Sequence, residues 1–188
     1  MAFHEPQLVQ GTARYQGACG ENMSKTRECL SPDTPLISTM ARYSGQGTVD
    51  RLGSLDLNLD GEVVNLAIVG SSNFYDFEVF EEIVEDWISR YGYPDLVIVG
   101  GASGVDYMAE RWTDANIIPI AVFSEEWNDP TRSLVDRGRA EAPNTLTEKI
   151  LDAATHVLAM PSPTSKWTKV VIDQAEDRRI PTEVREVG

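Results

Sequence analysis

From residue 63 onward, short runs of apolar residues alternate with longer segments in which apolar residues recur every three or four positions. The first pattern is typical of strands buried on both faces, and the second is typical of helices that bury one face. The runs that predict strands are residues 63–69, 96–99, 117–123, 156–160 and 182–187. The patterns that predict helices are residues 77–91, 105–112, 145–151 and 165–178.

Strands and helices that alternate along a chain form a parallel sheet with helices on both faces. We therefore predict an α/β protein, a three-layer sandwich with a mainly parallel sheet of about five strands. Pro119 lies in the third strand and places it on the outside of the sheet, because proline cannot donate to a strand ladder. Residues 1–62 lack a sustained apolar pattern and predict an irregular N-terminal extension, so that the domain would span residues 63–188.

The acidic composition bears on the partners of the chain. Thirty Asp and Glu residues against 16 Lys and Arg residues give a formal net charge of −14. Such a surface repels a phosphate backbone, so we do not expect DNA or RNA as the main partner. The apolar runs are far shorter than the roughly 20 residues of a bilayer span. Because the first residues do not resemble a secretory signal, we expect a cytoplasmic protein with no membrane association.

Cysteine and histidine are too few and too scattered to predict a metal site. Cys19 and Cys29 are the only cysteines, and His4 and His156 are the only histidines. Their spacing fits neither a zinc site nor a disulfide framework. We interpret His156, which lies within a predicted strand, as a structural histidine.

Three predicted strands run directly into a turn that precedes a helix. These turns are Gly70–Ser72, Gly100–Asp106 and Pro161–Thr168. Backbone N–H groups at the start of a helix are unpaired and the helix dipole favours anions, so each turn can hold a phosphate. All three lie at the carboxyl ends of strands, where open α/β sheets bind their ligands.

The second of these turns carries the most chemistry. Glycine at positions 100, 101 and 104 lets the backbone turn sharply and approach a ligand. Ser103 can donate a hydroxyl group and Asp106 can accept hydrogen bonds. A carboxylate in the first turn of a helix also stabilises the helix dipole, so the motif alone leaves a purely structural role open.

The sequence from Val97 to Asp106, preceded by Ile68–Ser72, resembles the YspA/YpsA-related branch of the SLOG superfamily. The likeness continues through Trp127, residues 154–160 and residues 164–175, and it covers about residues 64–187. Relatives include the lysine-decarboxylase-like phosphoribohydrolases and the DNA-processing protein A family. The resemblance implies a Rossmann-like fold that binds a nucleotide or nucleotide-derived ligand. It also implies a homodimer.

The resemblance further implies two walls around the ligand. The first wall would comprise Gly70, Ser71, Ser72, Gly100, Gly101, Ser103, Gly104 and Asp106. The second would comprise Ser165, Lys166 and Thr168, with Lys166 as a point charge for phosphate and Thr168 as a helix cap that touches the same oxygens. No cofactor is required, although a Mg²⁺ ion could accompany a phosphate beside Asp106.

Two departures from the family pattern bear on the reaction. Trp167 stands where the family has glycine, and it could either close off the backbone or line the site. Val171 stands where the phosphoribohydrolases carry a carboxylate, and valine can neither accept a proton nor stabilise a developing positive charge. We therefore interpret the chain as a module that binds or senses a nucleotide-type small molecule.

Two alternatives remain. The first is an N-glycosidase or phosphoribohydrolase that uses another carboxylate, with Asp106 as the catalytic candidate. The second is weak binding to single-stranded nucleic acid, which would need a basic stripe that the acidic sequence does not show.

Overall fold

The computed structural model describes residues 44–127 and 144–188. The predictions for Cys19, Cys29 and His4 lie outside the described residues. In chain order the elements are α1 (Gly45–Leu52), β1 (Asn65–Gly70), α2 (Phe77–Tyr91), β2 (Leu96–Val99), α3 (Val105–Asn116), β3 (Ile120–Val122), the 3₁₀ helix η2 (Ser124–Trp127), α4 (Asn144–Ala153), β4 (His156–Met160), α5 (Lys166–Asp177) and β5 (Thr182–Val184).

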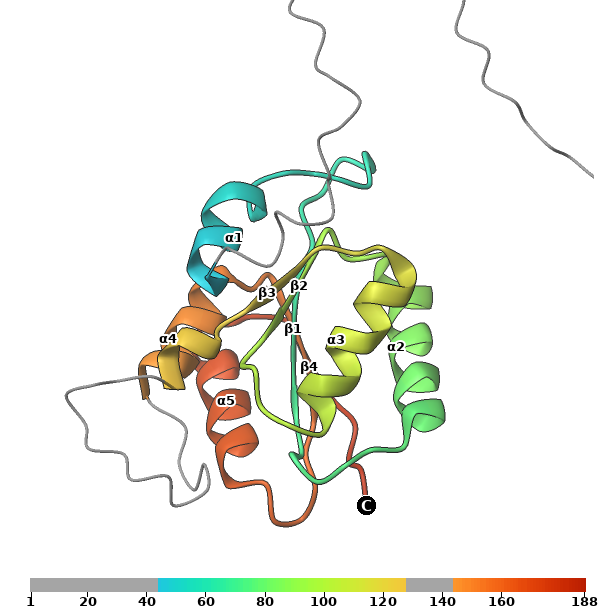
Figure 1. Cartoon of the computed structure of the whole chain (residues 1–188), viewed down its shortest axis with the longest axis vertical. Helices are drawn as coiled ribbons and strands as arrows, with labels where there is room; N and C mark the ends of the chain where they lie inside the picture. The colour runs from blue at the N-terminus through green and yellow to red at the C-terminus, as the bar shows by residue number, and fades with distance from the viewer. Residues whose placement is uncertain (1–43, 128–143) are drawn as a thin grey trace, which may run out of the picture. The chain divides into compact units, whose positions relative to one another are not determined.

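The five strands form one parallel sheet in the order β3-β2-β1-β4-β5. The chain enters at the central strand β1, builds outward to β3, and then crosses back to add β4 and β5 on the other side (Figure 1). The strand that follows Pro119 is an edge strand, as the proline predicts. The predicted α/β fold with a parallel five-stranded sheet is therefore confirmed.

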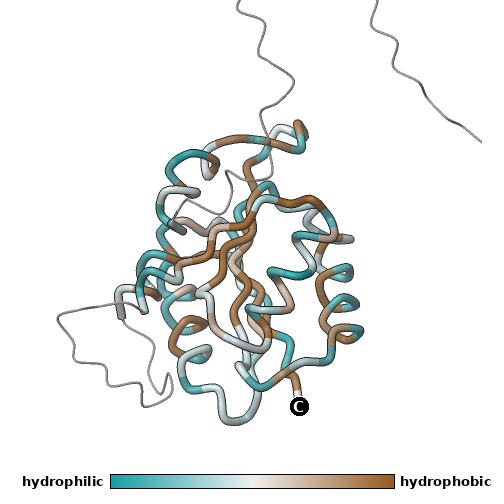
Figure 2. The backbone as a smooth tube through the Cα atoms, viewed as in Figure 1, coloured by the Kyte–Doolittle hydropathy of each residue, from teal (hydrophilic) through white to brown (hydrophobic). Residues whose placement is uncertain are grey.

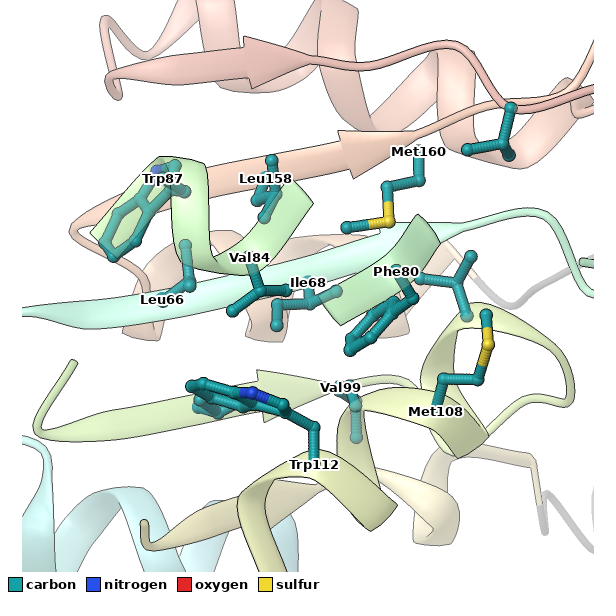
Figure 3. Close-up of a cluster of buried hydrophobic side chains, with 14 of the residues drawn as sticks. Leu66, Ile68, Phe80, Val84, Trp87, Val99, Met108, Trp112, Leu158 and Met160 are labelled. Atoms are coloured by element: carbon teal, nitrogen blue, oxygen red, sulfur yellow. The ribbon is translucent and has the colours of Figure 1, made fainter. Parts of the chain in front are cut away.

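Helices α2 and α3 cover one face of the sheet, and α4 and α5 cover the other (Figure 1). The strands form the hydrophobic centre of the protein, while the hydrophilic residues lie mostly on the helices and loops (Figure 2). Between the sheet and helices α2 and α3, buried side chains from the strands pack against buried side chains from the two helices (Figure 3). They include Leu66, Ile68, Phe80, Val84, Trp87, Val99, Met108, Trp112, Leu158 and Met160. Burial of a large apolar side chain contributes about 1.5–3 kcal/mol, so this layer is a main source of stability.

Helix α1 lies within the segment for which we expected no regular structure. It packs on the same side of the sheet as α4 and α5, with Val49 against their core. Gly45 approaches β3 so closely that a Cβ atom would lie 2.8 Å from the Phe123 ring. The buried positions of α1 are glycine and threonine, so no apolar stripe marks this helix in the sequence. The fold therefore begins before residue 63.

His156 lies at the start of β4 between two aromatic rings. Its ring is 5.8 Å from that of Trp87 and 5.5 Å from that of Tyr91, measured between centroids. Burial lowers the pKa of His156 below its usual value and favours the neutral ring. These contacts agree with its interpretation as a structural histidine.

A network of ion pairs joins the end of α2 to β5. Arg90 donates two hydrogen bonds of 2.6 Å to the carboxylate of Glu183, and Arg185 donates a third of 2.7 Å. Asp86 pairs with both arginines. Burial alone would raise the pKa of Glu183, but the hydrogen bonds from the two arginines outweigh it and lower the pKa from its usual 4.5.

We expect this network to make folding sensitive to acid. Because the pKa of Glu183 is lowered in the folded protein, the stability from its ionised form is present above pH 4.5 and is lost as the pH falls through the folded value. Urea titrations near neutral pH and below pH 4.5 measure this loss. The loss should be smaller in Glu183→Gln, and an equal loss in the parent and the variant would contradict the expectation.

Candidate functional site

The three predicted turns meet at one edge of the sheet. Strands β1, β2 and β4 are neighbours and run in the same direction, so their carboxyl ends lie together at the lower edge in Figure 1. The Ser71 N–H donates to the Met160 carbonyl at 3.0 Å, and the Val105 N–H donates to the Ser71 carbonyl at 3.1 Å. The turn after β1 thus contacts both the end of β4 and the start of α3.

The loop between β2 and α3, Gly100–Gly104, is held by hydrogen bonds from three directions. Trp127 donates its indole N–H to the Gly100 carbonyl at 2.6 Å. The Asp106 carboxylate accepts the Ala102 N–H at 3.0 Å, and the Ser103 hydroxyl donates to the Ser72 carbonyl at 3.1 Å. These bonds fix the loop before any ligand arrives.

Two positions in this loop require glycine. Gly101 and Gly104 have φ angles of +76° and +68°, which other residues rarely adopt. At Gly104 the space is also closed, because a Cβ atom would lie 2.2 Å from the Ser71 carbonyl oxygen. Glycine at position 104 therefore allows the loop to lie directly on the turn after β1.

An open pocket of about 360 Å³ lies on the outer side of the loop. It is lined by Tyr75, Gly101, Ala102, Ser103 and Tyr107. Its volume falls within the range of about 300–1,000 Å³ that is usual for small-molecule sites. The loop therefore presents its backbone to a space that can hold part of a nucleotide-sized ligand.

Only part of the lining follows from the sequence. Gly101 and Ser103 were predicted, whereas Ala102 and the two tyrosines were not. A signal for Tyr107 exists, because it lies outside the apolar stripe of Val105, Met108, Ala109 and Trp112 on α3, which indicates an exposed position. Tyr75, just before the N-cap residue of α2, carries no comparable signal.

Several residues of the predicted first wall do not line the pocket. Ser71 and Asp106 are buried, and Asp106 is only 1% exposed. Gly70 packs against the Val105 side chain, and Ser72 accepts the Ser103 hydroxyl through its carbonyl. Ser72 and Asp106 support the loop through hydrogen bonds. The Asp106 carboxylate reaches the pocket only indirectly, by accepting the N–H of the lining residue Ala102.

The predicted second wall is built differently from our expectation. Helix α5 begins at Lys166, so Thr168 lies inside the first turn and the prediction that it caps the helix is wrong. Ser165 occupies the N-cap position, but its hydroxyl accepts the Ser162 N–H instead of capping the helix. Lys166 is exposed, and none of these three residues lines the pocket described above.

Trp167 packs onto the loop from the side of α4 and α5. Its indole N–H donates to the Thr147 hydroxyl at 2.9 Å, and its ring would lie 3.4 Å from a Cβ atom on Gly100. Together with Trp127, which bonds to the Gly100 carbonyl, it covers this glycine. The loop is therefore open at Gly101–Ser103 and covered at Gly100.

Helix α3 carries a cation, Arg111, on the face that also carries Tyr107. Arg111 is one helical turn beyond Tyr107 on α3, and residues four apart share a helix face. Its guanidinium lies 4.2 Å from the ring centroid of Phe77, two residues after Tyr75. This cation–π contact fixes the Arg111 guanidinium on the Phe77 ring, between α3 and α2.

Residues 44–127 and 144–188 contain no cluster of three or more His, Cys, Asp or Glu side chains that could hold a metal ion. Within the same ranges, no helix is long and apolar enough to cross a membrane.

No protein-family model, no curated protein and no solved structure matched the chain. The fold and the loop nevertheless define a class of protein. The chain is a Rossmann-like α/β protein with a glycine-containing loop, fixed by hydrogen bonds, at the carboxyl edge of its sheet.

Proposed function

We propose that this protein binds a nucleotide or nucleotide-derived ligand, such as a nucleoside phosphate, ADP-ribose or a nucleotide sugar, in the pocket beside Gly101–Ser103. The observation that carries the proposal is a glycine loop braced by Asp106 and Ser72, with a pocket open on its backbone. A strand-to-helix turn at this edge of a parallel sheet favours anionic groups. A preformed loop also lowers the entropy lost on binding.

The lining favours binding over hydrolysis. None of the five lining residues carries a carboxylate, an imidazole or an amine. Asp106, the catalytic candidate, lies buried beneath the loop, where its carboxylate holds the Ala102 N–H. General acid–base catalysis needs a group within hydrogen-bond reach of the substrate, and among the described lining residues only the phenol groups of Tyr75 and Tyr107 belong to the usual kinds. We therefore place the N-glycosidase reading second.

The resemblance of the loop to the SLOG superfamily belongs to the same proposal. The parallel sheet and the contact between the turns after β1 and β2 support it. A cytoplasmic location is also part of the proposal, because nucleotides are abundant in that compartment.

A thermal-shift screen tests the proposal directly. The purified full chain is heated with nucleoside mono-, di- and triphosphates, ADP-ribose, NAD and nucleotide sugars, and each mixture is then analysed by liquid chromatography. A ligand at about 100 times its Kd stabilises the folded state by about 2.7 kcal/mol. A shift with the ligand intact supports binding, a shift with free base released supports the N-glycosidase, and no shift with any compound contradicts the proposal.

Ala102→Leu provides the matching structural test. Ala102 lines the pocket, and a leucine there should fill part of its volume and weaken binding about tenfold or more. Ala115→Leu makes the same change on the exposed surface of α3 and should bind like the parent. Calorimetric titration with the compound found in the screen measures both. Equal affinity in the two variants would place the ligand elsewhere.

A further inference from the structure

We propose that Tyr75 and Tyr107 form a stacking site for a planar base, so that the ligand is a nucleotide recognised through its base as well as its sugar phosphate. This inference rests on the proposed function, and it narrows the ligand class. It predicts that sugar phosphates without a base bind much more weakly.

The exposure of the two rings is the first observation. Tyr75 is 58% exposed and Tyr107 is 55% exposed, and both line the pocket beside the glycine loop. Within the described part of the chain, neither ring contacts another ring and neither hydroxyl forms a hydrogen bond. By contrast, Phe77 and Phe80 stack on each other at 6.0 Å. The two tyrosines thus contribute little to the core and leave their faces to solvent.

The backbone that carries each ring is well fixed. Tyr75 directly precedes Asp76, whose carboxylate caps α2 by accepting the Val79 N–H at 3.2 Å. Tyr107 lies in the first turn of α3, between the buried residues Asp106 and Met108. Because the backbone is already fixed, only the side-chain torsions of the two tyrosines lose freedom when a ligand binds. The two rings are therefore suited to hold a flat group between or against them.

The chemistry around the rings completes the argument. Bases stack on aromatic side chains, and this contact is tolerant of base identity because every base has a π face. Gly101, Ala102 and Ser103 line the same pocket beside the two rings. Arg111, held on the Phe77 ring, is a cation on the same face of α3 as Tyr107. An aromatic base matches the two exposed rings, and an anionic phosphate matches the cation on the same helix face.

The test compares nucleotides with ribose 5-phosphate on the full chain. Calorimetric titrations are run with AMP, GMP, CMP, UMP and ribose 5-phosphate, on the parent and on Tyr75→Ala and Tyr107→Ala. We expect at least one nucleotide to bind about tenfold or more tighter than ribose 5-phosphate. Each alanine variant should weaken that nucleotide between about fivefold and about 150-fold, which is the usual range for removing one stacking partner.

Two controls separate stacking from structural effects. Tyr75→Phe and Tyr107→Phe retain the ring and should bind within about twofold of the parent. Tyr93→Ala removes a tyrosine that is 54% exposed at the opposite edge of the sheet, before β2, and should leave binding unchanged. Melting temperatures of all variants check that the fold is intact.

Each outcome has a distinct meaning. The stacking site is overturned if nucleotides bind and both alanine variants bind them like the parent. It is also overturned if ribose 5-phosphate binds as tightly as every nucleotide. In both cases the proposed function stands. If neither these probes nor the compounds of the thermal-shift screen bind the parent, the proposed function fails and the stacking site fails with it.

Discussion

Replacing Gly104 with alanine is expected to destabilise the protein by about 3–5 kcal/mol, a large share of the 5–15 kcal/mol that holds a typical domain together. Two effects add at this position. The φ angle of +68° is unfavourable for any residue with a Cβ atom. That atom would also lie 2.2 Å from the Ser71 carbonyl oxygen and 2.5 Å from the Ser72 carbonyl carbon, so the two turns would have to separate.

Gly61→Ala is the matched control for this prediction. Gly61 also has a positive φ, at +97°, but a Cβ atom there would have nothing within 4 Å. Its substitution therefore measures the cost of a Cβ atom at a positive φ without a steric clash, about 1–3 kcal/mol. Urea unfolding of the parent and both variants gives the free energies. If Gly104→Ala lost no more stability than Gly61→Ala, the close packing of the two turns would be wrong.

The Gly104 contact also links stability to the site. It seats the loop on Ser71, whose own N–H reaches the end of β4. Ser71 thus connects the ends of β1 and β4 to the start of α3, which follows β2. Gly101, Ala102 and Ser103, which line the pocket, lie in the loop just before α3. A variant that forces the turns apart should therefore lose affinity together with stability. Tyr107→Ala, which removes only an exposed ring, should lose affinity with little change in stability.

The sequence predicted the fold well because the strands have a strong and simple signal. The runs before Gly70, Gly100 and Pro161 are almost wholly apolar, as strands buried on both faces require. Pro119 identified the edge strand correctly. Helix α1 escaped prediction because its contact with the sheet is made by Gly45 and Thr48, and close approach of backbone leaves no hydrophobic pattern.

The site was predicted only in outline. The glycine loop was found from its sequence because positive φ angles demand glycine at positions 101 and 104. Which side chains from different elements meet depends on tertiary packing, which no local pattern encodes. Asp106 therefore proved to be buried under the loop, and Trp167 proved to cover Gly100. The tyrosines at the pocket are outside any apolar stripe, so their meeting could be seen only in three dimensions.

Asp95 is the second position where a single substitution should have a large effect. Its carboxylate is 1% exposed and accepts three backbone N–H groups, from Leu57 at 2.6 Å, Asn58 at 2.9 Å and Val64 at 2.8 Å. It thereby ties the segment before β1 to the start of β2. Hydrogen bonds to a charged group contribute about 1.5–3 kcal/mol each, and a lost acceptor leaves donors unsatisfied. We expect Asp95→Ala to destabilise the protein by about 3–5 kcal/mol.

The location of Asp95 makes this variant informative about function as well. It lies at the amino edge of the sheet, opposite the glycine loop, so below its melting temperature Asp95→Ala should bind ligand like the parent. Asp60→Ala, at an exposed aspartate in the same segment, should change stability by no more than about 0.5 kcal/mol. Asp95→Asn should fall between them, because the amide keeps one acceptor oxygen. Urea unfolding ranks the three, and equal stability of Asp95→Ala and Asp60→Ala would show that the carboxylate does not hold this segment.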